Sequence, residues 1–90
     1  MNKQQKQNSL AVYRRRMGLT QKRMAELLGQ KNTGALSHYE KGQSLPPLAT
    51  ALAIGIILRV PVEFLFGSLY DALRLKIRAQ EEQELMHKDL

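Results

Sequence analysis

Residues 18–42 read GLTQKRMAELLGQKNTGALSHYEKG, and this segment carries the clearest helix signals in the chain. Thr20 can cap a helix that runs to about Leu28, because a threonine hydroxyl accepts a hydrogen bond from an amide of the first turn. Gly29 then ends that helix, since glycine accepts the left-handed conformation that follows many helix ends. The first half of the stretch therefore predicts one short helix with a defined start and stop.

The second half of the stretch predicts another helix after a polar turn at residues 30–32. Leu36 and Tyr39 have the spacing of buried positions on one helical face, and Gly42 supplies the next stop signal. We therefore expect a helix over about residues 33–40, joined to the preceding helix by a tight turn.

The same signals predict four more helices outward from this pair. They lie at about residues 9–17, 47–58 and 61–66, and from residue 68 onward; Ser9 is expected to cap the first. Two of them begin at a proline, which suits the first position of a helix because that amide would be unpaired anyway. No useful run of strand-like alternation is present, so the sequence predicts an all-α protein.

Length and charge restrict the possible functions. Ninety residues with 43% hydrophobic content form one domain, with room for a short appendage. We expect a flexible basic arm at residues 1–8, one domain at 9–67, and a C-terminal helix at 68–90 that dimerises or binds a partner. The net charge of +6 favours a polyanionic partner, because each neutralised phosphate releases condensed counterions.

Several classes of protein are not expected. The chain has no cysteine, which excludes disulfides, thiolate zinc sites and cysteine nucleophiles. With no nucleophile–base constellation and only two histidines, we expect no enzyme, no metal and no cofactor. The most apolar stretch, Leu45 to Phe66, contains three prolines and Arg59, so no membrane span is expected. The N-terminus is too polar for a secretory signal, and a cytoplasmic location is expected.

From about Leu10 to Phe66, the chain resembles the lambda repressor-like (XRE-type) helix-turn-helix family. The segments that carry the resemblance are Gly18-Leu19-Thr20-Gln21, Met24-Ala25-Glu26-Leu27-Leu28-Gly29, Leu36-Ser37-His38-Tyr39-Glu40-Lys41-Gly42 and Val60-Pro61-Val62-Glu63-Phe64-Leu65. The resemblance implies a five-helix domain, here followed by an additional C-terminal helix. It also implies a sequence-specific regulator of transcription that binds double-stranded DNA, more often a repressor, in a bacterium or phage.

The resemblance also indicates which residues would read bases. In this fold the second helix of the motif enters the major groove and presents its outward side chains to base edges. The candidate base contacts are Asn32, Thr33, Gly34, Ser37 and His38. One extra residue lies between Gly29 and Leu36 compared with the commonest family turn, so the register at Asn32 and Thr33 can shift by one. Both residues have a structural alternative, because asparagine and threonine before a helix often act as N-caps.

A second set of residues is expected to bind DNA phosphates. By the resemblance, Gln21 at the start of the first motif helix bonds a phosphate and braces the recognition helix. The other candidates lie nearby in the sequence, and those in the loop after the recognition helix could offer backbone amides as well as side chains. They are Lys22, Lys31, Lys41, Gln43 and Ser44. The resemblance further assigns Arg14 and Glu40 to an intramolecular salt bridge between the first helix and the end of the recognition helix.

One recognition helix reads only a few base pairs, so a homodimer on inverted half-sites is expected. The helix over residues 47–58 is apolar nearly all round, with Ala53 and Ile56 where solvent-facing polar residues would be expected. Leu69, Leu73 and Ile77 recur at i, i+4 and i+8 in the C-terminal helix. Either that helix folds back over the apolar one, or these surfaces meet across a dimer axis; dimerisation is favoured.

Two other functions fit the sequence. In one, the domain binds its own promoter while the C-terminal helix neutralises a toxin protein, so that the chain is an antitoxin. In the other, the chain is a protein-binding adaptor that has kept the fold and lost DNA contact. The glycine in the recognition helix favours the adaptor, whereas the +6 charge and Gln21 oppose it.

Overall fold

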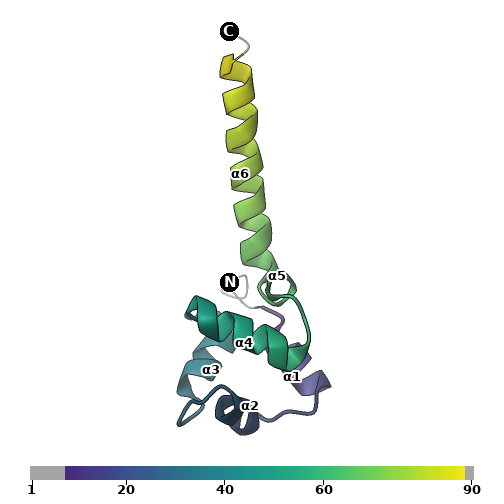
Figure 1. The fold of residues 1–90 in the computed structure, drawn as a ribbon, viewed down its shortest axis with the longest axis vertical. Helices are drawn as coiled ribbons and strands as arrows, with labels where there is room; N and C mark the ends of the chain where they lie inside the picture. The colour runs from purple at the N-terminus through teal and green to yellow at the C-terminus, as the bar shows by residue number, and fades with distance from the viewer. Residues whose placement is uncertain (1–7, 89–90) are drawn as a thin grey trace.

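The computed structural model describes residues 8–88, with side chains to residue 86, and this part of the chain is all α-helical. The predicted arm at residues 1–8 therefore lies, except for Asn8, outside the described residues. Six helices follow one another in this part of the chain (Figure 1). They are α1 (Leu10–Arg16), α2 (Gln21–Leu27), α3 (Gly34–Glu40), α4 (Leu48–Leu58), α5 (Val62–Leu65) and α6 (Gly67–Lys88).

The first five helices surround one hydrophobic core. Each contributes one fully buried large side chain: Leu10, Met24, Leu36, Ile54 and Leu65. Burying such a side chain contributes about 1.5–3 kcal/mol, which no helix of four to eleven residues could gain alone. The helices are therefore stable because they pack together, and α2 and α3 are held at a fixed mutual orientation by the same core.

The helix starts agree with the sequence to within one residue. Thr20 Oγ1 accepts a hydrogen bond from Arg23 N at 3.0 Å, which confirms the predicted cap of α2. Pro47 and Pro61 each occupy the N-cap position, one residue before the predicted one. Both have ψ near 150° (159° and 143°), and this extended conformation places them just before a helix rather than in its first turn.

Ser9 occupies the N-cap position of α1, as predicted, but it does not cap the helix through its side chain. The Ser9 side chain makes no capping hydrogen bond. Instead, Asn8 Oδ1 accepts from Leu10 N at 2.9 Å. Asparagine and serine are comparably good caps, so the sequence could not decide between two adjacent candidates.

Helices α4 and α5 meet at Gly55. A Cβ atom added to this buried glycine would lie 3.0 Å from Val60 O and 3.2 Å from Val62 Cγ2. The backbone after α4 also folds back toward this glycine, where Val60 N donates to Gly55 O at 3.1 Å. Gly55 therefore sets how closely α5 approaches α4.

Helix α6 extends away from the five-helix domain as a single rod (Figure 1). Its side chains from Ser68 to Met86 are all exposed. The alternative in which the C-terminal helix folds back over α4 is therefore wrong, and Ile56 on α4 remains 76% exposed. Of the helices in the described residues, α6 included, none combines the length and apolar character needed to cross a membrane.

Candidate nucleic-acid interface

Helix α3 has one buried face and one free face. Leu36 and Tyr39 are buried in the core, as the sequence predicts. The candidate recognition residues lie elsewhere on the helix: Gly34 and His38 are exposed, whereas Thr33 and Ser37 are half-buried. Side chains on the free face of a helix-turn-helix recognition helix are those that can meet base edges in the major groove.

The side chain of Asn32 has a structural partner at the start of α3. Its Oδ1 accepts from Gly34 N at 2.9 Å, so Asn32 caps the helix. The helix begins at Gly34 rather than at Thr33, whose side chain makes no capping bond. Because Oδ1 is engaged, the Nδ2 of Asn32 is the group of this side chain that can donate to a base.

A buried polar network holds α3 against the two preceding helices. Arg14 Nε donates to Glu40 Oε2 at 2.6 Å, and Arg14 Nη2 donates to Glu40 Oε1 at 3.2 Å. The two side chains are only 9% and 7% exposed. The ion pair that the resemblance implies is thus present, bidentate and buried, a geometry in which both charges are well satisfied.

Two further bonds extend this network. Arg14 Nη1 donates to Leu19 O at 2.9 Å, in the turn before α2. Gln21 Nε2 donates to Glu40 Oε1 at 2.9 Å, from the first residue of α2 to the last of α3. Gln21 therefore braces the recognition helix with one N–H, while its second N–H can still donate to a phosphate oxygen.

The cationic and polar candidates flank this helix pair. Lys22, Lys31 and Lys41 are exposed, as are Gln43 and Ser44. The expectation of a free backbone amide after α3 is wrong for Gln43, and the amide of the preceding Gly42 is also occupied. Gly42 N donates to Tyr39 O at 3.1 Å, and Gln43 N to His38 O at 2.9 Å, because these amides satisfy the last carbonyls of α3.

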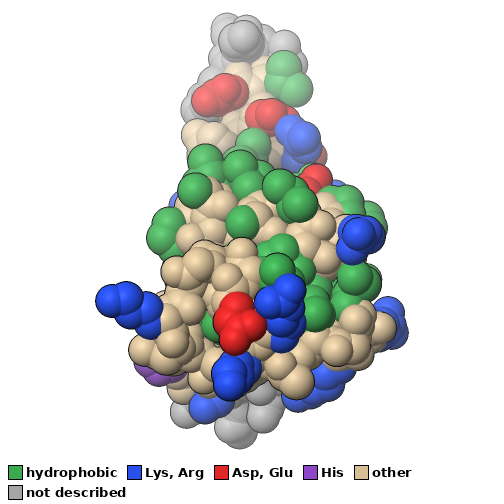
Figure 2. Space-filling model, turned by 60° about the horizontal axis from the view of Figure 1, so that its bottom comes forward, with side chains coloured by type: hydrophobic (Ala, Val, Ile, Leu, Met, Phe, Trp, Pro, Cys, Tyr) green, Lys and Arg blue, Asp and Glu red, His purple; other side chains and the backbone are tan. Residues whose placement is uncertain are grey.

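Positive charge predominates on the five-helix domain. Residues 8–66 contain eight Lys and Arg but only three Glu. Glu40 is neutralised by Arg14, and Glu26 lies 3.2 Å from Arg23. Figure 2 shows Lys and Arg side chains spread around this part of the molecule, with acidic side chains scarce among them. Such a surface attracts a phosphate backbone.

One residue near the interface was not singled out by the sequence. Asn8 was assigned to the arm, yet its Nδ2 donates to Tyr39 O at 2.8 Å near the end of α3. Ser9 N also donates to Leu65 O at 3.1 Å. The segment before α1 is therefore attached to both α3 and α5. The sequence signal for this attachment was an asparagine two residues before the first apolar residue of a helical pattern.

The residues expected at a dimer or partner surface lie on two separate elements. On α4, Ile56 is exposed and Ala53 is half-buried. On α6, Leu69, Leu73 and Ile77 are 41%, 48% and 52% exposed. Two further members of the α4 surface were not predicted from the sequence. Leu48 and Leu52 precede Ile56 at i−8 and i−4, and they are 74% and 51% exposed.

Comparison with known proteins agrees with this architecture. The family model described as helix-turn-helix matches residues 10–65, which are α1 to α5 and the connections between them. Searches of curated proteins and of solved structures found no match. The matched segment covers more than half of the chain and contains both helices of the motif. The chain therefore belongs to the XRE-type, lambda repressor-like helix-turn-helix family of DNA-binding proteins.

Proposed function

We propose that this DNA-binding transcriptional regulator is a repressor that binds inverted-repeat operators as a homodimer in the cytoplasm. The observation that carries the proposal is the buried network of Arg14, Glu40 and Gln21, which fixes α3 relative to α2. A helix that must reach base edges needs such support, because recognition depends on placing side chains to within about 0.5 Å. Members of this family are typically regulators without enzymatic activity.

In this proposal, His38 reads a base from the free face of α3. An imidazole N–H can donate to the N7 or O6 of a guanine in the major groove. Thr33 and Ser37 add hydroxyl groups, Asn32 adds its Nδ2, and Gly34 permits close approach of the backbone. In this proposal the flanking phosphates are held by the second side-chain N–H of Gln21 and by Lys22, Lys31, Lys41, Gln43 and Ser44.

A selection of bound sequences from a random duplex pool, with purified protein at moderate salt, tests this function. The expected result is an enriched inverted repeat with half-sites about 10 base pairs apart, or a multiple of that spacing. If only weak, salt-sensitive binding without a motif is recovered, the DNA-reading role is wrong. The adaptor, or an antitoxin that needs its partner, would then replace it.

Substitution of His38 by alanine should weaken binding to the selected operator by about twofold to tenfold, since a single hydrogen bond contributes about 0.5–1.5 kcal/mol net. Binding to random duplex should change little. Titrations of both duplexes at one salt concentration measure the two effects.

Gln21→Ala is the matched comparison for this substitution, because Gln21 is assigned to phosphate and to Glu40. It should weaken binding to the random duplex as well as to the operator, with little change in salt dependence since glutamine is uncharged. Equal losses on both duplexes for His38→Ala would remove His38 from base reading.

The proposed dimer uses the exposed apolar surfaces of α4 and α6. Substitution of Ile56 by glutamate should raise the dimer dissociation constant, because the new charge would lose its hydration on association. The fold should persist, since Ile56 is 76% exposed. Light scattering over a concentration series measures the mass; an unchanged mass profile would exclude the α4 surface from the dimer.

A further inference from the structure

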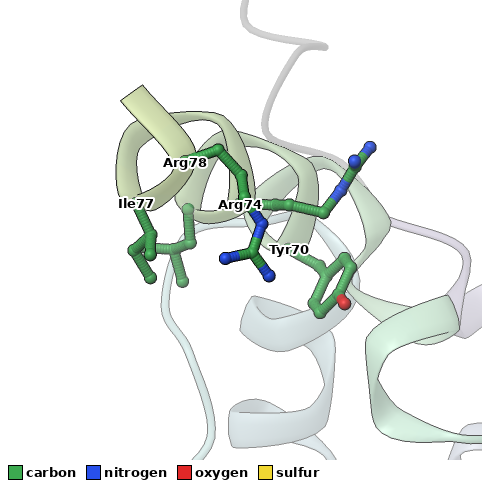
Figure 3. Close-up of a pocket in the computed structure, with 5 residues that line it drawn as sticks. Tyr70, Arg74, Ile77 and Arg78 are labelled. Atoms are coloured by element: carbon green, nitrogen blue, oxygen red, sulfur yellow. The ribbon is translucent and has the colours of Figure 1, made fainter. Parts of the chain in front are cut away.

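Helix α6 carries an uncovered apolar stripe on one side of the rod. Tyr70, Leu73 and Ile77 are 47%, 48% and 52% exposed, and they line a shallow groove together with Arg74 and Arg78 (Figure 3). The spacing from Tyr70 to Leu73 to Ile77 is three and then four residues, as at the a and d positions of a heptad. Side chains at this spacing form a seam that a second helix can cover.

We propose that this stripe pairs with the same stripe of a second copy, as a short parallel coiled coil in register. The inference rests on the proposed dimeric function and assigns its contact and orientation. With Tyr70 and Ile77 at a and Leu73 at d, the next seam positions are Gln80 and Glu84. The apolar contact is thus confined to the half of α6 nearest the domain.

Charge complementarity decides the orientation. In the heptad set by Tyr70 and Ile77, Lys76 occupies a g position and Glu81 the following e position. In a parallel pair these two positions of opposite chains lie beside each other. Lys76 of each copy therefore lies next to Glu81 of the other, and the symmetric pair makes this contact twice.

The antiparallel arrangements are less favourable. If the apolar residues stay together, Leu73 faces Ile77 of the other copy. Arg74 then lies beside the equivalent arginine of that copy, and Lys76 lies beside the equivalent lysine. If the helices slide until basic residues meet acidic ones, Leu73 faces Glu84. The first arrangement brings like charges together, and the second removes an apolar side chain from its apolar partner.

The shortness of the seam predicts a contact that depends on DNA. A coiled coil with apolar residues at only three positions is weak by itself, because most stable ones sustain the pattern over several heptads. Two domains bound to adjacent half-sites hold their α6 helices at a high effective concentration, and pairing then becomes intramolecular. The pairing of α6 should therefore strengthen operator binding cooperatively.

Single cysteines test the pairing, because the natural chain contains none. Gln80→Cys places a thiol at a d position, where it meets its equivalent only in a parallel, in-register pair. Glu82→Cys is the matched control, since position 82 is an f position on the opposite side of the same exposed helix. Under mild oxidation, Gln80→Cys should form a disulfide-linked dimer, faster with operator DNA, and Glu82→Cys should remain reduced.

A charge exchange gives an independent readout in the cysteine-free chain. Lys76→Glu and Glu81→Lys should each raise the dimer dissociation constant, by about tenfold for two exposed ion pairs turned repulsive. The double exchange should restore it. Glu81 also accepts a hydrogen bond from Arg78 of its own helix at 2.7 Å. The double exchange does not restore that bond. Recovery of the dimer dissociation constant in the double variant therefore identifies the contact between chains.

The outcomes separate this inference from the proposed function. If Gln80→Cys crosslinks no better than Glu82→Cys on operator DNA while the selection yields an inverted repeat, the pairing is wrong and the function stands. If the thiols crosslink and the double exchange rescues but no motif is recovered, the pairing stands and the function is wrong. A double exchange without rescue also overturns the pairing.

Discussion

Substitution of Arg14 by methionine should lower the free energy of unfolding by about 3–5 kcal/mol, because it leaves Glu40 charged and buried without its cation. The two side chains are only 9% and 7% exposed, so water cannot replace the lost contact. This is a large share of the stability of a small domain, commonly about 5–15 kcal/mol. Urea unfolding followed by circular dichroism measures the change.

The double substitution Arg14→Met with Glu40→Met is the control for this prediction. It removes both charges and leaves apolar side chains in their place, so most of the stability should return. A double variant as unstable as the single would mean that the network acts through shape and not through charge. The interaction free energy from the full cycle separates the two cases.

Substitution of Gly55 by alanine should lower the free energy of unfolding by about 1–3 kcal/mol, although alanine favours helix more than glycine. The added methyl group would lie 3.0 Å from the carbonyl oxygen of Val60, a backbone atom that cannot move without shifting α5. The same urea titration measures the loss.

Gly67→Ala is the matched comparison, because Gly67 is also the glycine of a helix and has no atom within 4 Å of an added Cβ. This variant should be neutral or more stable by up to about 1 kcal/mol. Equal losses for Gly55→Ala and Gly67→Ala would show that the close approach of α5 to α4 is not what makes glycine necessary at position 55.

The helices were predictable because each carries its own local signals. Thr20 and Gly29 bracket α2, and Leu36 and Tyr39 identify the buried face of α3. The structure places these residues as their spacing predicts, since the apolar side chains of a short helix can be covered only from one side. The resemblance to the helix-turn-helix family added the pairing of Arg14 with Glu40, which no local pattern contains.

The remaining errors concern contacts between elements. The sequence placed Asn8 in a free arm, whereas its side chain bonds α3. Fold-back of the C-terminal helix stayed open beside the favoured dimerisation, because apolar spacing defines a face and not its partner.

The projecting α6 affects how the size of this protein is measured. A compact domain of 90 residues has a radius of gyration of about 12 Å. The value here is 16.4 Å, with extents of 57 × 31 × 22 Å. An elongated particle experiences more friction than a sphere of equal mass, so a monomer would elute early from a sizing column. Sedimentation equilibrium does not depend on shape, and it can therefore distinguish one elongated chain from two associated ones.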